Sequence, residues 1–357
     1  MTERDAMVRA IRLAWQGWGR VHPNPMVGAL VLSRGAVVGE GWHGEFGGPH
    51  AEPLALEVAG ERARGGTLVV TLEPCAHFGK QPPCVDAILR AGIRRCVIGA
   101  ADPHPLAAGG ADRLRAAGVE VEIGLESDAV RGQNAAFFGA LRHPERPFVA
   151  LKLATTLDGR IADATGASRW ISGPAAREWV QWLRAGFEAI AVGGRTALVD
   201  DPSLTVRGPI TPRVAPIRVV FDRRALIPAG ARVVATAREV PTIVVVDARI
   251  DSARIMALEE RGVEVIRADG LDDALARLRR RGISSLLVEG GGHLAGALMD
   301  AGLVDRFYWI QAPAWLGDDG APAFRGVRGR PLAAIERWHV VERKPLGEDT
   351  LLVADRP

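Results

Sequence analysis

Apolar residues recur along the chain with two different spacings, and these spacings predict a succession of helices and strands. Apolar positions three or four residues apart predict helices at about 3–19 and 127–142, and a further helix is expected with Ser172 as its cap and Pro174 in its first turn. Short apolar runs predict buried strands at 27–32, 37–43, 67–72, 95–98, 119–123, 148–154, 189–193 and 284–288. Because strand and helix signals alternate, we expect α/β layers with sites at the carboxyl ends of strands.

The segment His143-Pro144-Glu145-Arg146-Pro147 interrupts this succession. Its two prolines break both helix and strand, so the segment is interpreted as a linker. At 357 residues the chain is also too long for one small hydrophobic core. We therefore predict a first domain at 1–143, a linker at 144–147 and a second domain at 148–357.

The composition narrows the class of function. A hydrophobic content of 48% and a charged content of 24% are typical of soluble globular proteins. The formal net charge of +3 comes without a block of Lys or Arg, so it does not indicate nucleic-acid binding and suits small phosphorylated substrates equally well. No signal peptide or membrane-spanning run is apparent. Three cysteines do not make a disulfide framework, and Cys96 is expected in the core, so we expect a cytoplasmic protein.

Candidate chemistry is concentrated between His50 and Cys84. His50, Cys75 and Cys84 can supply one imidazole and two thiolates to Zn²⁺ and leave its fourth position open for a water, as catalytic zinc sites do. Glu52 follows at the start of an apolar helical run, where its carboxylate can reach that water. The pattern resembles the zinc-deaminase signature H-x-E…P-C-x-x-C, although here the cysteines stand farther apart. It predicts zinc-hydroxide deamination, but argues against the common cytidine and tRNA-adenosine deaminases.

A closed structural zinc knot is the alternative, with His43 or His77 as the fourth ligand. Pro83 precedes Cys84 at an expected helix start, where the helix dipole stabilises a thiolate. The open, catalytic site is the better interpretation.

Polar residues also mark the ends of buried strands in the second half. Lys152 lies in the apolar strand at 148–154 and either serves a site or reaches solvent with its long side chain. The loop at 200–207 is dense in functional groups. After the strand at 284–288, a run of glycines leads into a helix whose N–H groups can approach a phosphate, although tight strand–helix packing explains the glycines equally well. The run is not G-x-G-x-x-G, so it does not support a Rossmann fold.

Taken in order, these residues resemble the bifunctional riboflavin-biosynthesis deaminase–reductase family over nearly the whole chain. The long spacing between Cys75 and Cys84 is the spacing of that family. The motifs that carry the resemblance are Pro23-Asn24-Pro25-x-Val27-Gly28, His50-Ala51-Glu52, Thr71-Leu72-Glu73-Pro74-Cys75-x-His77-x-Gly79-Lys80-x-Pro82-Pro83-Cys84, Leu157-Asp158-Gly159, Trp170-Ile171, Leu183-Arg184-Ala185, Asp200-Asp201-Pro202-x-Leu204-Thr205-x-Arg207 and Glu289-Gly290-Gly291.

For the first half, the resemblance implies a cytidine-deaminase-like three-layer α/β/α domain. It would hydrolyse the 2-amino group of 2,5-diamino-6-ribosylamino-4(3H)-pyrimidinone 5′-phosphate, with zinc on His50, Cys75 and Cys84 and with Glu52 moving protons from the water to the leaving ammonia. The positions that match substrate contacts are Asn24, His43, His77 and Lys80, of which Lys80 suits the 5′-phosphate.

For the second half, the resemblance implies a dihydrofolate-reductase-like α/β domain. It would use NADPH to reduce the ribosyl group of 5-amino-6-(5-phosphoribosylamino)uracil to ribityl, with Lys152 giving electrostatic or proton help near the sugar carbon. The matching dinucleotide contacts are Ala154, Trp170, Thr196, Asp200, Asp222, Gly291, Gly292, His293, Leu294, Ala295, Gly296 and Ala297. The matching substrate contacts are Ser168, Arg184, Leu204, Arg207 and Glu289, the arginines pairing with phosphate. The family also implies a homo-oligomer.

A few positions depart from the family pattern. His104 replaces the usual Asn of Asp-Pro-Asn-Pro, and the following loop at 106–110 is expected to be shorter than usual. Gln181 replaces a frequent His one helical turn before Arg184. Arg195 is bulky where a small residue is expected, and we hypothesise that it contacts the 2′-phosphate of NADPH.

Other functions are compatible with parts of the sequence. One is a deaminase of another base, free or in RNA, fused to a module that only binds; Lys80 and the long cysteine spacing argue against it. Another is a zinc-stabilised scaffold without activity. Glu52 beside an open metal position argues against that one.

Overall fold

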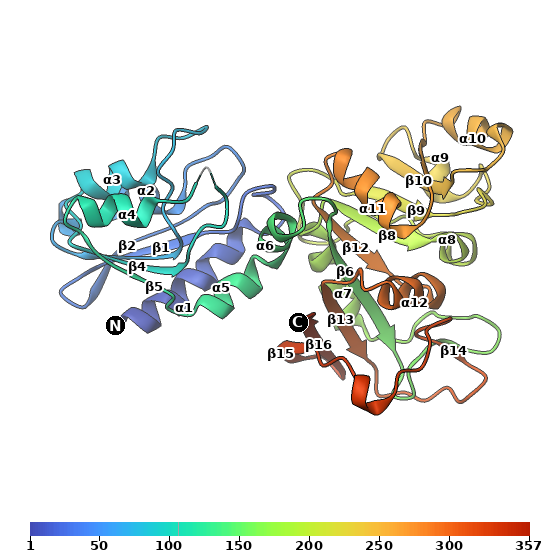
Figure 1. Cartoon of the computed structure of the whole chain (residues 1–357). Helices are drawn as coiled ribbons and strands as arrows, with labels where there is room; N and C mark the ends of the chain where they lie inside the picture. Colours follow the sequence, from blue (N-terminus) through green and yellow to red (C-terminus); the bar gives the residue numbers. More distant parts are fainter. Residues whose placement is uncertain (106) are drawn as a thin grey trace. The chain divides into compact units, whose positions relative to one another are not determined.

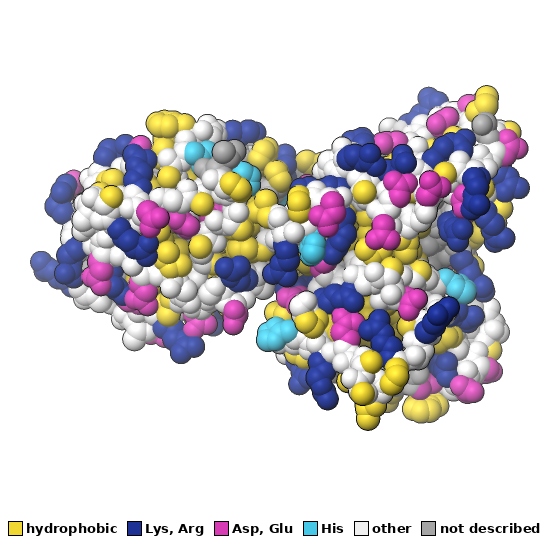
Figure 2. All heavy atoms as spheres, in the orientation of Figure 1, with side chains coloured by type: hydrophobic (Ala, Val, Ile, Leu, Met, Phe, Trp, Pro, Cys, Tyr) yellow, Lys and Arg dark blue, Asp and Glu magenta, His cyan; other side chains and the backbone are white. Residues whose placement is uncertain are grey.

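The computed structural model describes residues 1–105 and 107–357, so the loop expected at 106–110 lies partly outside the described residues. The chain forms two compact units, Met1–Arg142 and His143–Pro357, and each has its own large sheet (Figure 1). Within the described ranges, no helix has the length and apolar character that a membrane span requires. On the face drawn in Figure 2, basic and acidic side chains are intermixed.

A five-stranded sheet in the order β2-β1-β3-β4-β5 forms the centre of the first unit. Strand β1 is antiparallel to β2 and β3, whereas β3, β4 and β5 are parallel. Helices α2, α3 and α4 cover one face, and α1 and α5 cover the other (Figure 1), which confirms the predicted three-layer arrangement. The elements are α1 (Glu3–Ala14), η1 (Trp15–Gly17), β1 (Gly28–Ser33), β2 (Ala36–Trp42), α2 (Ala51–Ala59), η2 (Gly60–Ala63), β3 (Thr67–Leu72), α3 (Cys84–Arg90), β4 (Arg95–Ala100), α4 (Gly110–Ala116), β5 (Glu120–Ile123), α5 (Ser127–Gln133) and α6 (Ala135–Arg142).

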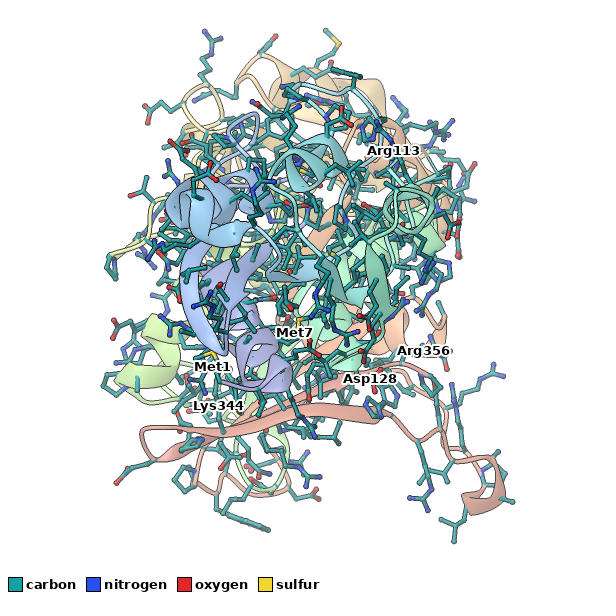
Figure 3. The ribbon with its side chains drawn as sticks, turned by 90° about the vertical axis from the view of Figure 1, so that its left-hand side faces the viewer. Met1, Met7, Arg113, Asp128, Lys344 and Arg356 are labelled. Carbon is teal, nitrogen blue, oxygen red and sulfur yellow. The ribbon has the colours of Figure 1, made fainter. Side chains whose placement is uncertain are left out.

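Alternating side chains along β1 produce the two faces of this sheet. Ala29 and Val31 pack with the helices on one side. Leu30 and Leu32 pack on the other side with Met7 of α1, which is labelled in Figure 3. Successive side chains of a strand point to opposite faces, so one apolar strand serves both layers.

Two glycines let α2 lie directly against β2. A Cβ atom on Gly39 would stand 2.1 Å from the carbonyl oxygen of Ala55, and one on Gly41 would stand 2.4 Å from that of Ala51. Any larger residue would push the helix away from the strand. These glycines therefore set the position of the first turn of α2, where Glu52 lies.

The helix predicted at 127–142 is in fact two helices, α5 and α6, which are interrupted at Asn134. Asn134 has φ −103° and ψ 27°, outside the α-helical region. The prediction of one continuous helix was wrong because it rested on the local apolar pattern. The side chain of Asn134 bonds instead to the backbone of Met26, 108 residues away.

The second unit is built on a nine-stranded sheet in the order β11-β10-β9-β8-β12-β6-β13-β16-β15. The strands from β11 to β13 in this order are parallel, and β16 and β15 add antiparallel neighbours at one edge. The elements are β6 (Phe148–Thr155), β7 (Arg160–Ala162), α7 (Pro174–Ala185), β8 (Ala189–Gly193), α8 (Gly194–Asp200), β9 (Ile217–Phe221), α9 (Arg232–Ala235), β10 (Thr242–Asp247), α10 (Ser252–Glu259), β11 (Glu264–Ala268), α11 (Leu271–Arg280), β12 (Ser285–Glu289), α12 (Gly292–Asp300), β13 (Arg306–Gln311), β14 (Ala321–Pro322), η3 (Leu332–Ala334), β15 (His339–Leu346) and β16 (Asp349–Asp355).

Both faces of this sheet are buried, which explains its nearly continuous apolar strands. Ala189 and Ala191 of β8 face a core that includes α11 and α12, whereas Ile190 and Val192 face a core that includes α8, α9 and α10. The predicted mixed α/β fold of this half is thereby confirmed.

The start of α7 differs in one detail from the expectation. Pro174 is the first helical residue, as predicted, but Gly173 rather than Ser172 is the capping residue. Asp349 of β16 accepts a hydrogen bond from the Gly173 N–H at 2.7 Å. A distant carboxylate thus anchors the residue before the helix, without capping the N–H groups of the first turn.

Candidate active sites

The three predicted metal ligands of the first unit lie together. Nδ1 of His50 is 3.2 Å from Sγ of Cys84 and 3.7 Å from Sγ of Cys75, and the three donor atoms all lie within 4.8 Å of one another. A tetrahedral Zn²⁺ with ordinary Zn–N and Zn–S lengths separates such donors by roughly 3.5 Å. The donor set and its spacing therefore fit zinc.

Each ligand is positioned by the end of a regular element. His50 is the residue just before α2, and Cys84 is the first residue of α3. Cys75 follows β3, and its sulfur accepts the backbone N–H of Cys84 at 3.4 Å. A helix N-terminus favours a thiolate at this place.

The two thiols and the imidazole influence one another's pKa values. Contact with the Cys84 thiol lowers the pKa of Cys75 to about 4, whereas the pKa of Cys84 is raised by the same contact and by burial. The pKa of His50 is raised, chiefly by its bond to Cys75. Zinc requires both thiols deprotonated, so its binding here releases a proton.

Glu52 lies beside the three donors without being one of them. Its side chain is in the first turn of α2, is only 3% exposed and contacts the Cys84 thiol. Burial raises the pKa of Glu52 to about 7, against the opposing charge of His50. A carboxyl group in this position can take up and return a proton next to a metal.

His43 and Asn24 form a hydrogen-bonded pair next to the ligands. His43 donates from Nδ1 to the carbonyl oxygen of Pro49 at 2.9 Å, which leaves Nε2 as an acceptor for Nδ2 of Asn24 at 3.2 Å. The ring of His43 meets that of His50 edge to face, with centroids 5.4 Å apart. Burial lowers the pKa of His43, which favours this neutral tautomer. His43 belongs to the site but is not a member of the metal cluster.

The other two predicted substrate residues of this unit lie on an exposed loop. His77 and Lys80 are both exposed, and His77 is not part of the metal cluster formed by the described residues. Nζ of Lys80 lies 3.9 Å from the centroid of the Phe46 ring. The loop thus presents an exposed cation, which suits the phosphate contact that the family resemblance implies.

Two residues to which the motifs assigned no role support the segments around the ligands. Glu73 is buried and accepts N–H groups of Asp102, Gly109 and Ala111 at 2.9–3.1 Å. Arg113, labelled in Figure 3, donates to the carbonyl oxygen of Ala76 at 3.4 Å and pairs with Asp86 at 2.5 Å. Glu73 precedes Pro74-Cys75 in the sequence, which was the available signal; nothing local identified Arg113.

The second unit contains a cleft of about 1610 Å³ at the carboxyl ends of its parallel strands. Most of the reductase positions predicted from the sequence line it: Lys152, Ala154, Ser168, Trp170, Arg184, Thr196, Asp200, Leu204, Arg207, Asp222, Glu289, Gly291, Gly292, His293, Leu294 and Ala297. Ala295 and Gly296 do not, because they lie on the buried side of α12. A Cβ atom on Gly296 would stand 2.1 Å from the carbonyl oxygen of Arg325, so this glycine serves close packing.

Three charged side chains meet inside the cleft. Arg184 donates to Glu289 through Nε at 2.5 Å and Nη2 at 3.1 Å, and Nζ of Lys152 lies 3.9 Å from Oε2 of the same carboxylate. Burial lowers the pKa of Lys152, although Glu289 opposes this. Burial alone would raise the pKa of Glu289, but Arg184 and Lys152 outweigh it and hold that pKa below its ordinary value.

Two side chains of α7 hydrogen-bond to the backbone of the loop that follows α8. Nη1 of Arg184 donates to the carbonyl oxygen of Thr205 at 2.9 Å, and Oε1 of Gln181 accepts the Arg207 N–H at 2.9 Å. Gln181, a departure from the family pattern, thus holds the backbone of Arg207. Leu204, just before Thr205 in the loop, is buried.

The glycine run after β12 requires glycine at Gly291. This residue has φ +81°, and a Cβ atom would stand 2.6 Å from Oγ1 of Thr196. Asp222, also predicted as a cofactor contact, uses Oδ2 to accept the Ile227 N–H at 2.7 Å. Its carboxylate therefore shapes its own turn while lining the cleft.

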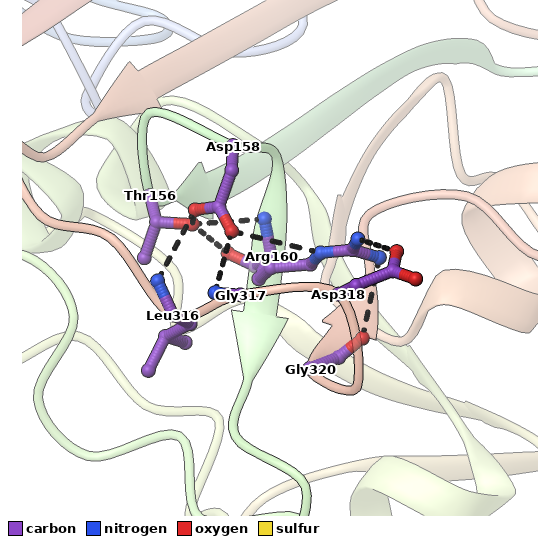
Figure 4. A network of polar contacts seen from close by, with 7 residues as sticks. All are labelled: Thr156, Asp158, Arg160, Leu316, Gly317, Asp318 and Gly320. Carbon is purple, nitrogen blue, oxygen red and sulfur yellow. Dashed lines mark hydrogen bonds and ion pairs between the residues drawn. The ribbon is translucent and has the colours of Figure 1, made fainter.

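The Leu157-Asp158-Gly159 motif is explained by a network of polar contacts (Figure 4). Asp158 accepts the Gly317 N–H at 2.8 Å and the Thr156 hydroxyl at 2.6 Å. Arg160 pairs with Asp318 at 2.8 Å and donates to the Gly320 carbonyl oxygen at 3.3 Å. The network joins the turn after β6 to the segment before β14, and so braces the small β7–β14 sheet beside the cleft.

The cleft is also lined by arginines that the sequence motifs did not indicate. Arg223 and Arg249 both pair with Asp247, at 3.3 Å and 3.0 Å. Arg195, singled out in the sequence, also lines the cleft. They bring positive charge to the ends of β8, β9 and β10.

Comparisons with known proteins assign each half of the chain to a known family. Residues 1–100 match the family model of the cytidine and deoxycytidylate deaminase zinc-binding region, and residues 147–352 match that of the RibD C-terminal domain. The chain is 40% identical to the riboflavin biosynthesis protein RibD of Aquifex aeolicus, over 99% of this chain and 98% of the relative. It is 38% identical to that of Escherichia coli, over 99% of both.

Solved structures show the same likeness. The structure of Acinetobacter baumannii RibD, form 1, superposes with a TM-score of 0.85 at 36% identity, over 99% of both chains. A diaminohydroxyphosphoribosylaminopyrimidine deaminase/5-amino-6-(5-phosphoribosylamino)uracil reductase from Thermotoga maritima superposes with a TM-score of 0.85 at 35% identity, also over 99% of both chains.

Proposed function

The chain belongs to the RibD family of bifunctional riboflavin-biosynthesis enzymes, with a deaminase and a reductase domain, and we propose the substrates and residues through which it acts. The first unit deaminates 2,5-diamino-6-ribosylamino-4(3H)-pyrimidinone 5′-phosphate. The second reduces the ribosyl group of 5-amino-6-(5-phosphoribosylamino)uracil to ribityl with NADPH. The observation that carries this proposal is the pairing, in one chain, of Glu52 beside a three-donor cluster with Lys152 beside Glu289 in a large cleft.

In the first unit, His50, Cys75 and Cys84 hold zinc, which when bound supplies an activated water as the nucleophile. Glu52 accepts a proton at its carboxylate and delivers it to the departing amino group, so that ammonia leaves. Asn24 and His43 orient the pyrimidine, because their side chains form a fixed pair next to His50. Lys80 and His77, on the exposed loop, receive the 5′-phosphate.

In the second unit, reduction adds a hydride to the sugar carbon and must also place a proton on the ring oxygen as the ribose opens. Lys152 is the proton donor, since of the two cations beside Glu289 its ammonium group can give up a proton, whereas the guanidinium of Arg184 stays charged. Arg184 and Arg207 bind the substrate phosphate, with Ser168, Leu204 and Glu289 as the other substrate contacts. The dinucleotide would contact Gly291, Gly292, His293, Leu294 and Ala297 on one side, and Ala154, Trp170, Thr196, Asp200 and Asp222 on the other, all of which line the cleft.

We also propose the domain limits 1–143 and 148–357. The partners are small phosphorylated pyrimidines. The enzyme acts in the cytoplasm as a homo-oligomer. Two sites in one chain do not require the intermediate to be channelled between them.

The test gives zinc-loaded protein the diaminopyrimidinone ribotide, with and without NADPH, and follows ammonia and NADPH absorbance. We expect ammonia without NADPH, and oxidation of NADPH when it is then added. Ammonia without any NADPH oxidation would reduce the second unit to a binding module. No ammonia from protein that holds one zinc would refute the substrate.

A further inference from the structure

We propose that Asn134 is a positioning residue for the deaminase site, and that it acts by fixing the loop that carries Asn24. Asn134 stands at the break between α5 and α6 and belongs to none of the motifs that identify the site. The inference rests on the proposed function, in which Asn24 contacts the pyrimidine.

Asn134 binds both backbone groups of a single residue. Its Oδ1 accepts the Met26 N–H at 2.8 Å, and its Nδ2 donates to the Met26 carbonyl oxygen at 3.0 Å. Asn134 is 4% exposed and Met26 is 5% exposed. The side-chain amide of Asn134 thus makes the two backbone hydrogen bonds that a neighbouring strand would otherwise make to Met26. Met26 lies just before β1, which begins at Gly28.

The neighbouring residue is held from another side. The carbonyl oxygen of Val27 accepts the His43 N–H at 2.9 Å, so the segment Met26-Val27 is bonded both to Asn134 and to His43. Proline on both sides of Asn24 leaves its backbone little freedom. Fixing Met26 therefore also fixes the direction from which Asn24 approaches the site.

From Asn24 a continuous path leads to the metal ligands. Asn24 donates to Nε2 of His43, and His43 donates from Nδ1 to Pro49, the residue before His50. The orientation of the Asn24 amide is set by this acceptor nitrogen, which leaves Oδ1 of Asn24 as the end able to accept a hydrogen bond from an amino group. If Met26 shifts, Asn24 loses its alignment with His43, and substrate binding weakens although the ligands stay in place.

Gln133, next to Asn134 in the sequence, makes a contact that serves stability alone. Gln133 is also buried, at 7% exposed, and its Nε2 donates to the backbone carbonyl oxygen of Ile11 at 2.7 Å. That bond joins α5 to α1 and does not involve the Met26-Val27 backbone. Gln133→Ala is therefore the matched control for Asn134→Ala.

The experiment measures deaminase kcat and KM with the diaminopyrimidinone ribotide for zinc-loaded full-length protein. The variants are Asn134→Ala, the nearly isosteric Asn134→Asp, Asn24→Ala, the double variant Asn24→Ala/Asn134→Ala, and Gln133→Ala. Zinc content, thermal unfolding and reductase kcat/KM on the deaminated product are recorded for each, because the reductase in the same chain reports the amount of intact protein.

We expect Asn134→Ala and Asn134→Asp to raise the deaminase KM about ten-fold, the effect of losing one good hydrogen bond, with one zinc per chain and unchanged reductase kcat/KM. The double variant should be no worse than Asn24→Ala alone, since both changes remove the same contact. Gln133→Ala should lower thermal stability but leave KM unchanged.

Four results would overturn the inference. They are a lower kcat at unchanged KM in both Asn134 variants, an equal rise of KM in Gln133→Ala, multiplied effects in the double variant, and a rise of KM in Asn134→Ala without one in Asn24→Ala. Absence of ammonia from the zinc-loaded wild type would instead refute the proposed function, and the inference with it.

Discussion

Arg184 and Glu289 meet as a two-point pair although they stand 105 residues apart, with Nε of the arginine 2.5 Å from Oε1 and Nη2 3.1 Å from Oε2. The arginine comes from α7 and the carboxylate from the end of β12. Lys152 faces the same carboxylate from the adjacent strand β6. One buried anion thus compensates two cations in the cleft.

Glu289→Gln should destabilise the second unit by about 3 kcal/mol at neutral pH, because it leaves buried cations without their counter-ion. The pKa of Glu289 lies below its ordinary value, so its carboxylate contributes stability above that ordinary value, and the contribution is lost as the pH falls through the lowered pKa. Urea unfolding should therefore show a difference in the free energy of unfolding between wild type and variant that is largest at about pH 7. This difference should shrink below about pH 4. If this difference did not depend on pH, Glu289 would not act as a charged partner of Arg184 and Lys152.

Lys152→Met should lower the reductase rate about 100-fold or more, the usual contribution of a positioned proton donor. Since burial lowers the pKa of Lys152, the wild-type rate should fall with rising pH at a lower pH than for an ordinary lysine, and this fall should be absent in the variant. Reductase pH profiles with NADPH test this, with deaminase activity as the internal control. A change of less than about three-fold would exclude Lys152 as the donor.

Glu52→Gln should lower deamination about 100-fold or more while the protein keeps its zinc, because Glu52 lies beside the ligands but supplies none of the three donor atoms. Zinc analysis of the purified variant and an ammonia assay check the two halves of this expectation. If the variant lost its zinc together with its activity, Glu52 would instead be required for zinc binding. Reductase activity should be unaffected.

Arg195→Ala should raise KM for NADPH about ten-fold and much more than KM for NADH, if its guanidinium contacts the 2′-phosphate. Arg249→Ala is the comparison, because Arg249 also lines the cleft but is engaged by Asp247. Equal effects of Arg195→Ala on both cofactors would refute the contact.

Local motifs identified the deaminase chemistry because its parts are attached to the ends of predicted elements. Strand β3 lies at the predicted residues, His50 directly precedes α2, and Cys84 begins α3. The mixed α/β fold and the family could also be predicted, since alternating apolar runs and ordered motifs are properties of the chain itself. The same local view failed at Asn134, where an apolar pattern suggested one helix, and at Gly173, which Asp349 rather than Ser172 supports.

The sequence by itself determined which residues could hold a metal, approach a phosphate or move a proton, because these capacities depend on residue type and on spacing within a turn or two. Only the tertiary structure decided which of them act together. Glu289 meets Arg184 and Lys152, Asn134 holds Met26, and Glu73 binds the N–H groups of a distant loop. Such contacts join residues 29 to 137 positions apart, and only the packing of sheets and helices brings these residues together.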